Sequence, residues 1–289
     1  MAGATHSDNP GRPLSRDTTR AVDALPPLPA VAMKVMQVAQ DPKSSASDLA
    51  MVVSADPGLS ARILRVVNSA AYRRASEVTS VQQALVVLGF VQARNIAISS
   101  AITSAYTPDT LNALFRISAF WRHSLAVGFR AADIAARGRR LDVPSAFTAG
   151  ILHNMGRLAM FFADPAGVDQ SVALAIGQDR TLEDVEREHL GYDHAELGGQ
   201  LAEKWKLPSE IREAVAQHHT HTGTESNLAG VVAAADAFCV THGILPGYLI
   251  PARETPHDAL PDEVSRLLRQ VDTLMELVGS ASVGVRMVA

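Results

Sequence analysis

The segment Gly150-Ile151-Leu152-His153-Asn154-Met155-Gly156 places two adjacent polar residues inside an apolar stretch. Residues 146–156 include no charged side chain, so we expect them to lie in a buried, helical part of the protein. Imidazole is a common metal ligand, whereas an amide is a poor one. Asn154 stands where a metal site would use a carboxylate, and the chemistry of the segment therefore depends on this residue.

The composition predicts a folded, helical protein. Of its 289 residues, 47% are hydrophobic and 19% are charged, which provides a sizeable core and argues against global disorder. Aromatic residues make up only 5%, and the abundance of Ala, Val and Leu favours packed helices. The net charge of -4 argues against a surface that coats nucleic acid.

The cysteine content and the lack of long apolar segments indicate the cellular compartment. The single cysteine, Cys239, excludes an intramolecular disulfide and is typical of a reducing cytosol. No apolar run reaches the roughly 18 residues that span a bilayer, and the N-terminus has no apolar signal core. We expect a cytoplasmic protein that does not contact a membrane.

Helix signals follow one another along the chain. Residues 1–20 are polar and are expected to form a disordered arm. The first half should form helices that start at Pro29, Ser47, Asp56-Pro57, Ser80 and residue 91. The second half should form helices over residues 111–136, from Pro144 to Phe162, from Thr181, from Asp193, from Pro208 to His219, from Asn227, and over 264–278. The prolines between residues 244 and 262 should interrupt helix formation.

Asp236 is the only charged residue between Leu228 and Val240. A helix would place it on an apolar face, and an unpaired buried carboxylate costs several kcal/mol. We therefore expect a partner for it, which would be a cation, a histidine or helix-end amides. A structural arginine or a backbone amide is the alternative.

Several histidines share these apolar surroundings. Each one taken alone is explained as a core histidine bonded to a carbonyl, or, for His218-His219, as a helix C-terminus favoured by the helix dipole. Taken together, they form a set of metal-capable side chains on separate helices. The candidate degenerate metal site comprises His123, His153, Asn154, His194, His218, His219 and Asp236.

The order of these motifs resembles the HD superfamily of metal-dependent phosphohydrolases. It is more similar to the HDOD branch, the HD-related output domains of bacterial signalling proteins. The resemblance is carried by residues 25–29, 56–59, Leu64, 68–70, Ser80, Ala84, 88–89, Arg94, His123, 150–156, 191–198, Trp205, 207–208 and 218–219. It implies an all-α fold, with an N-terminal helical lobe (residues 21–108) packed on an HD-like lobe (109–240). A proline-rich segment and a C-terminal helix (241–289) would follow.

The resemblance also suggests roles for the candidate ligands. In the HD superfamily a His, a His-Asp pair and a late Asp hold metal, and these correspond to His123, His153 with Asn154, and Asp236. The other three histidines resemble the extra ligands of two-metal cyclic-dinucleotide phosphodiesterases of the HD-GYP branch. The sequence departs from these enzymes at Asn154 and at residues 220–223, which lack the Gly-Tyr-Pro element.

Three functions are consistent with the sequence. We favour a non-catalytic signal-transduction module that binds a signalling protein or a small signal such as a nucleotide or cyclic dinucleotide. The alternative is a metal-dependent phosphohydrolase with a degenerate site. A nucleic-acid-linked regulator would use Arg137, Arg139 and Arg140 or Arg73 and Arg74, but solvated surface arginines are the better explanation. We assign no catalytic residue, and we expect no cofactor beyond at most a divalent cation: Fe, Mn, Zn or Ni.

Overall fold

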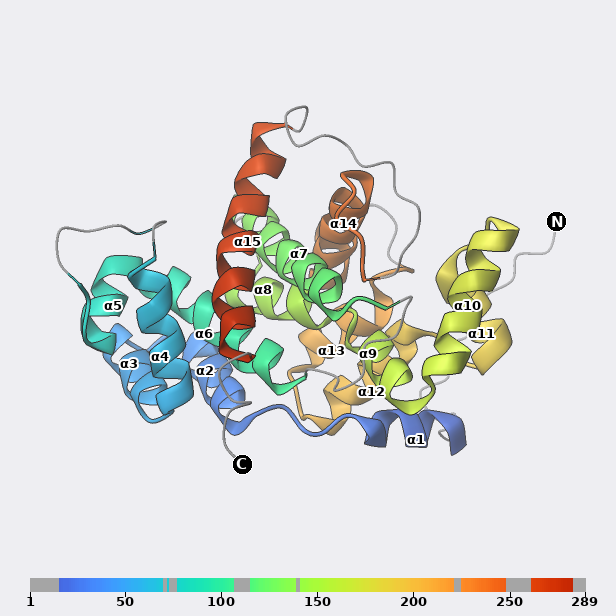
Figure 1. The fold of residues 1–289 in the computed structure, drawn as a ribbon, viewed down its shortest axis with the longest axis horizontal. Coiled ribbons are helices and arrows are strands. Elements are labelled where there is room, and N and C mark those ends of the chain that lie inside the picture. Colours follow the sequence, from blue (N-terminus) through green and yellow to red (C-terminus); the bar gives the residue numbers. More distant parts are fainter. Residues whose placement is uncertain are drawn as a thin grey trace.

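A computed structural model describes residues 16–69, 72, 77–106, 115–138, 141–220, 225–247 and 261–282. The regular elements among these residues are all α-helices (Figure 1), which confirms the all-α fold. The helices form two groups, and the last helix of the chain stands between them (Figure 1).

The first group comprises α2 (Ala30–Gln40), α3 (Ala46–Ser54), α4 (Pro57–Val67), α5 (Val81–Leu88) and α6 (Phe90–Ala105). Asp56 caps α4 through the amide of Leu59, and Ser80 caps α5, as predicted. The predicted cap at Ser47 is wrong. The capping box is formed two residues earlier, where Ser45 and Asp48 each accept the other's backbone N–H.

The second group contains the site. It comprises α7 (Ile117–Gly138), α8 (Val143–Leu152), α9 (Met155–Ala163), α10 (Pro165–Gln178), α11 (Leu182–Leu190), α12 (His194–Lys204), α13 (Ser209–Gln217) and α14 (Leu228–Thr241). Asp193 and Asn227 cap α12 and α14 as predicted. Helix α10 was not predicted, although Asp164 caps it and Pro165 occupies its first turn.

Two predicted segments differ from the structure in ways that bear on the site. The single stretch expected from Pro144 to Phe162 is divided, because α8 ends at Leu152 and α9 begins at Met155. The helix expected to reach His219 ends at Gln217, with His218 as its C-cap. In both cases the chain leaves the helix at candidate ligands.

Helix α1 (Arg16–Ala24) shows that the arm expected over residues 1–20 ends earlier, because residues 16–20 are helical. Residues 1–15 lie outside the described part of the chain. α1 packs against α9 and α12 of the second group (Figure 1), where Lys204 Nζ contacts the carboxylate of Asp23 and the carbonyl of Val22, each at 2.9 Å.

Helix α15 (Asp262–Ser282) packs against α7 on one side and against α4 and α6 on the other. The apolar stripe of this helix is buried and belongs to the core: Leu267, Leu268, Val271 and Leu274. α15 therefore joins the two groups of helices.

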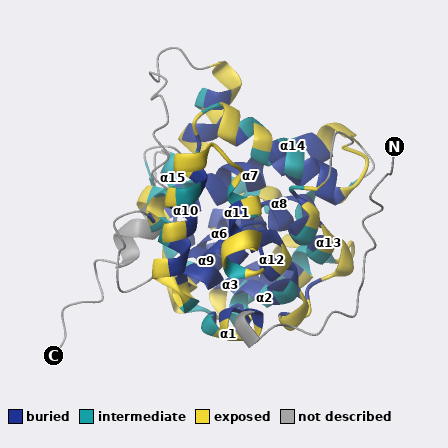
Figure 2. Cartoon of the chain, turned by 90° about the vertical axis from the view of Figure 1, so that its right-hand side faces the viewer, coloured by how far each residue is buried: buried dark blue, intermediate teal, exposed yellow. Residues whose placement is uncertain are grey.

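The core is continuous across both groups, and buried residues line the inner faces of α7, α8, α9 and α14 (Figure 2). No single helix of the described residues is long and apolar enough to cross a membrane. Only α5 and α6 together reach that length and composition, and the chain bends by 118° between them.

Candidate metal centre

His153 and Asn154 form the junction between α8 and α9, and both are buried. Glycines on either side bring this junction into the core. A Cβ on Gly150 would lie 2.6 Å from the Cα of Gly128 in α7, and a Cβ on Gly156 would lie 1.9 Å from a backbone oxygen of α12. Only glycine permits backbones to approach this closely, so the two glycines hold the junction against α7 and α12.

The first group of donors brings together His123 from α7, His153 and Asp236 from α14. His123 Nε2 lies 3.1 Å from Asp236 Oδ1 and 3.3 Å from His153 Nε2, and His153 Nε2 lies 3.8 Å from the same carboxylate oxygen. The ligand atoms of the three residues are all within 4.8 Å of one another. The partners of Asp236 are thus histidines, one of the three kinds of partner expected for it, rather than an arginine.

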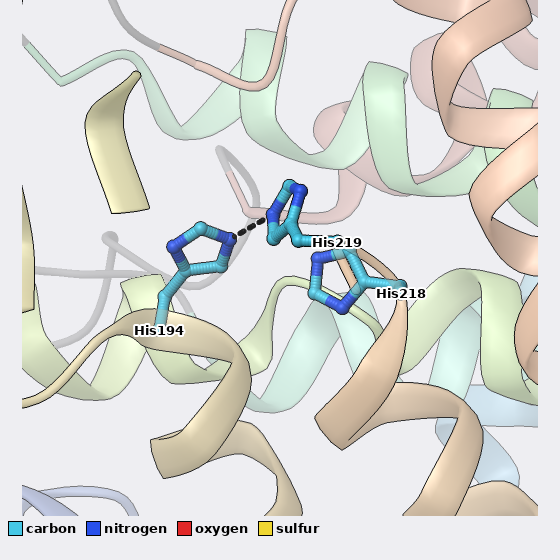
Figure 3. Close-up of side chains that lie close together, drawn as sticks. All are labelled: His194, His218 and His219. Atoms are coloured by element: carbon cyan, nitrogen blue, oxygen red, sulfur yellow. Dashed lines mark hydrogen bonds between the residues drawn. The ribbon is translucent and has the colours of Figure 1, made fainter. Parts of the chain in front are cut away.

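The second group contains His194, at the start of α12, and His218 and His219, just after α13 (Figure 3). His194 Nε2 lies 2.7 Å from His219 Nε2. The ring of His218 connects the two groups, because its centroid lies 5.0 Å from that of His153 and 5.4 Å from that of His194. Six of the seven predicted site residues therefore form one continuous cluster, and Asn154 is adjacent to it in the chain.

The inner rings are fixed by hydrogen bonds at Nδ1, the nitrogen that points away from the cluster. The acceptors are Ile244 O for His123 (2.7 Å), Gly150 O for His153 (2.6 Å), Val215 O for His218 (2.7 Å) and Glu186 Oε2 for His194 (2.5 Å). Because a carbonyl or carboxylate only accepts, each Nδ1 carries the hydrogen and directs Nε2 into the cluster. Histidines that bind metal are typically oriented in this way.

The donors fit a divalent cation. The buried Nε2 of His218 has no hydrogen-bond partner, and imidazole nitrogens with a carboxylate oxygen suit Zn, Fe, Mn or Ni. Nε2 of His123 and Oδ1 of Asp236 lie 3.1 Å apart, so a cation between them would contact both residues.

Burial controls the protonation of the other histidines. It lowers the pKa of His153 and His194 well below the usual value, and with the nearby histidines it lowers the pKa of His218 to about 3 and of His219 to about 2. Burial also raises the pKa of Asp236. The hydrogen bond with His123 and the neighbouring histidine charges outweigh it and hold that pKa well below its usual range. Four imidazoles of the cluster are thus neutral and its one carboxylate is ionised.

Asn154 supplies no charge to this cluster. It is 1% exposed, and its Oδ1 is buried without a hydrogen-bond partner. An aspartate here would bring a second negative charge to the centre, whereas the amide offers a neutral oxygen and a donor nitrogen.

Two charged residues near the cluster were missed by the sequence analysis. Glu186 of α11 accepts both the backbone N–H (3.0 Å) and the ring Nδ1–H (2.5 Å) of His194, and burial raises its pKa to about 7. No local spacing marks Glu186, because its helix is otherwise highly charged. Arg157 lowers the pKa of His194 and His219 by its positive charge. It is the only charged residue of α9, the same signal that revealed Asp236.

Of the arginines that a nucleic-acid-linked regulator would use, only Arg137 lies in the described part of the chain. Arg137 pairs with Asp133 and Glu263 on the surface, which favours the explanation as a solvated arginine. The others lie outside the described part of the chain: Arg73, Arg74, Arg139 and Arg140.

The fold and the cluster agree with the comparison to known families. The HDOD domain family matches residues 25–221, well over half of the chain. The chain belongs to the HDOD family. The curated relatives that it matches are longer proteins, and the chain spans less than half of their length.

Relatives with solved structures share the whole fold. A Shewanella amazonensis SB2B protein named "Putative phosphohydrolase" is 29% identical, with a TM-score of 0.65 over 93% of this chain and 94% of that one. A Marinobacter aquaeolei VT8 protein named "Putative signal transduction protein" is 25% identical, with a TM-score of 0.70 over 94% of this chain and 62% of that one. Among curated sequences, a protein of Treponema pallidum (strain Nichols) is 21% identical over 86% of this chain and 47% of its own length.

Proposed function

We propose that this chain is a regulatory HDOD module that holds a divalent cation in its core without hydrolysing phosphate esters, and that it acts by binding a signalling protein or a small signal. Asn154 is the observation that carries the proposal. It lies buried at the α8–α9 junction, where the resemblance to HD hydrolases expects an aspartate. The similarity to a protein named for signal transduction adds support.

The charge of the cluster favours one cation over two. Its two donor groups contain five histidines and a single carboxylate, Asp236. Two divalent cations would leave an excess of positive charge in the core, and buried charge that is not compensated is strongly unfavourable. Glu186 compensates part of it only while ionised, and Asn154 adds nothing.

The enclosure of the donors also argues against turnover. His123, His153 and His194 are fully buried and His218 is 3% exposed. Among the six donors only Asp236 and His219 reach the surface, with 15% and 19% of their side chains exposed. A phosphate ester would need open access to several donors at once, so this arrangement suits a structural cation better than a substrate.

When bound, a cation would supply positive charge at a point where five helices meet, and in a hydrolase it would also lower the pKa of water. Residues of the chain orient the donors and hold the helices together around the centre. The Nδ1 hydrogen bonds fix the ring orientations, and Gly150 and Gly156 hold α8 and α9 against their neighbours. The centre would thereby link α7, α8, α12, α13 and α14 into one unit to whose arrangement a partner responds.

Phosphohydrolase activity is the second candidate, because every candidate ligand except Asn154 belongs to one of the two donor groups. We would assay the parent protein, Asn154→Asp and Asn154→Ala with bis(p-nitrophenyl) phosphate and a cyclic dinucleotide, with Fe, Mn or Zn supplied. The proposal predicts that only Asn154→Asp hydrolyses either compound, since Asn154→Ala removes the amide without adding charge. Hydrolysis by the parent that disappears in His153→Ala would contradict it.

A further inference from the structure

A groove of about 250 Å³ lies where α15 meets the first group of helices, away from the histidine cluster. One wall is a single face of α15, with residues spaced at i, i+3, i+4, i+7 and i+8. The opposite wall comes from the end of α4 and from α6. The lining residues are Arg266, Arg269, Gln270, Thr273 and Leu274 on α15, and Val66, Tyr72 and Gln92 across from them.

The two arginines of the groove are not neutralised. Two of the four acidic residues of α15 pair on its other side, Asp272 with Arg122 and Glu263 with arginines of α7. Within the part of the chain that the structure describes, neither Arg266 nor Arg269 forms an ion pair. The dense pairing along the α7 side thus leaves two guanidinium groups unpaired at the edge of the groove.

The other polar groups add hydrogen-bond donors. Gln92 Nε2 donates to Tyr72 Oη at 3.1 Å, which leaves the tyrosine hydrogen free to donate into the groove. Val66 and Leu274, both almost fully buried, provide an apolar floor. A donor-rich rim with two guanidinium groups selects a phosphoryl anion, because guanidinium binds phosphate oxygens in pairs.

We propose that this groove binds the phosphoryl group of a small soluble molecule, such as a nucleoside monophosphate. The phosphate would lie between Arg266 and Arg269, and a planar ring would cover the apolar floor beside Tyr72. The ligand would contact α15 and the first group of helices together, so it would hold them in one arrangement. Its role as the input of the module rests on the proposed function, whereas the binding itself does not.

Calorimetric titration of the full chain with GMP tests the site. Each lost guanidinium–phosphate contact weakens binding about tenfold, so Arg266→Gln with Arg269→Gln should weaken it roughly a hundredfold. Both side chains are exposed and unpaired, and the double variant should keep the helical content of the parent. Arg212→Gln, a partly exposed arginine on α13, is the control and should bind GMP as the parent does. Guanosine, which lacks the phosphate, should not bind, and inorganic phosphate should compete with GMP.

Three results would overturn the site. Equal GMP affinity in the parent and the double variant is the first. The second is binding lost in His219→Ala and kept in the double variant, which would place the phosphate at the histidine cluster. The third is binding to vesicles that contain phosphatidic acid without any binding of GMP, which would mean a lipid surface. Phosphate-ester hydrolysis by the parent would contradict the proposed function and leave this binding site intact.

Discussion

Acidification should destabilise this protein steeply at mildly acidic pH, because four histidines of the cluster stay neutral when folded. Burial holds the pKa of His153, His194, His218 and His219 below that of an unfolded histidine, 6.5. A lowered folded-state pKa gives stability that is present above the unfolded pKa and is lost as the pH falls below it. The unfolded chain then binds protons that the folded protein excludes.

The size of the loss in stability follows from the lowered pKa of these four histidines. From about pH 7 to about pH 5.5, the protonated fraction of an unfolded histidine rises from about one quarter to about nine tenths. Each histidine that stays neutral in the folded protein therefore lowers the free energy of unfolding by about 1.2 kcal/mol, and four lower it by about 5 kcal/mol. Glu186 acts in the opposite sense. Its pKa of about 7 lies above the unfolded value, so protonation at lower pH restores about 1.6 kcal/mol. The net loss is about 3 kcal/mol, a large part of the 5–15 kcal/mol that typically stabilises a protein.

Urea unfolding followed by circular dichroism, with a chelator present, measures this loss at the two pH values. His219→Gln should reduce it by about 1.2 kcal/mol, since one shifted histidine is removed. His189→Gln, an exposed histidine on α11, should leave it unchanged. A free energy of unfolding that is constant or rises between about pH 7 and about pH 5.5 would refute the reasoning.

Two further substitutions test how the cluster is built. Glu186→Gln should weaken metal binding by about 10- to 100-fold in a chelator competition, because His194 loses its carboxylate partner. Glu188→Gln on the same helix is the control. An equal effect of both substitutions would contradict the role of Glu186. Gly156→Ala should cost more than about 3 kcal/mol in the free energy of unfolding, since its Cβ would meet a backbone oxygen at 1.9 Å. Gly177→Ala, in open space on α10, should instead stabilise the protein by about 0.5–1 kcal/mol, and similar effects of both changes would argue against close packing at Gly156.

Local signals predicted much of the fold. Asp56, Ser80, Asp193 and Asn227 cap helices as expected, because a cap depends on a side chain and an amide two or three residues away. The break at His153 was not predicted. Its flanks are apolar on every side, and the reason for the break is a pair of tertiary contacts made by Gly150 and Gly156.

The candidate site was predicted as a set of residues without its geometry. An isolated carboxylate in an apolar helix identified Asp236, and the same reasoning applies to Arg157. Glu186 carries no such signal, because only the folded chain brings α11 to the start of α12. Sequence spacing also gave no indication that His218 connects the two groups of donors, since that contact depends on how α8, α12 and α13 converge.

Elemental analysis of the purified protein, expressed with Fe, Mn and Zn supplied, tests the metal centre most directly. The account predicts about one divalent ion per chain, held by imidazole and carboxylate donors and lost in Asp236→Ala. Arg212→Gln, which removes an arginine that pairs with Glu203 and not with a candidate ligand, should retain the ion. A parent protein with full helical content and no bound metal would contradict the account, and the converging histidines would then be a hydrogen-bonded core alone.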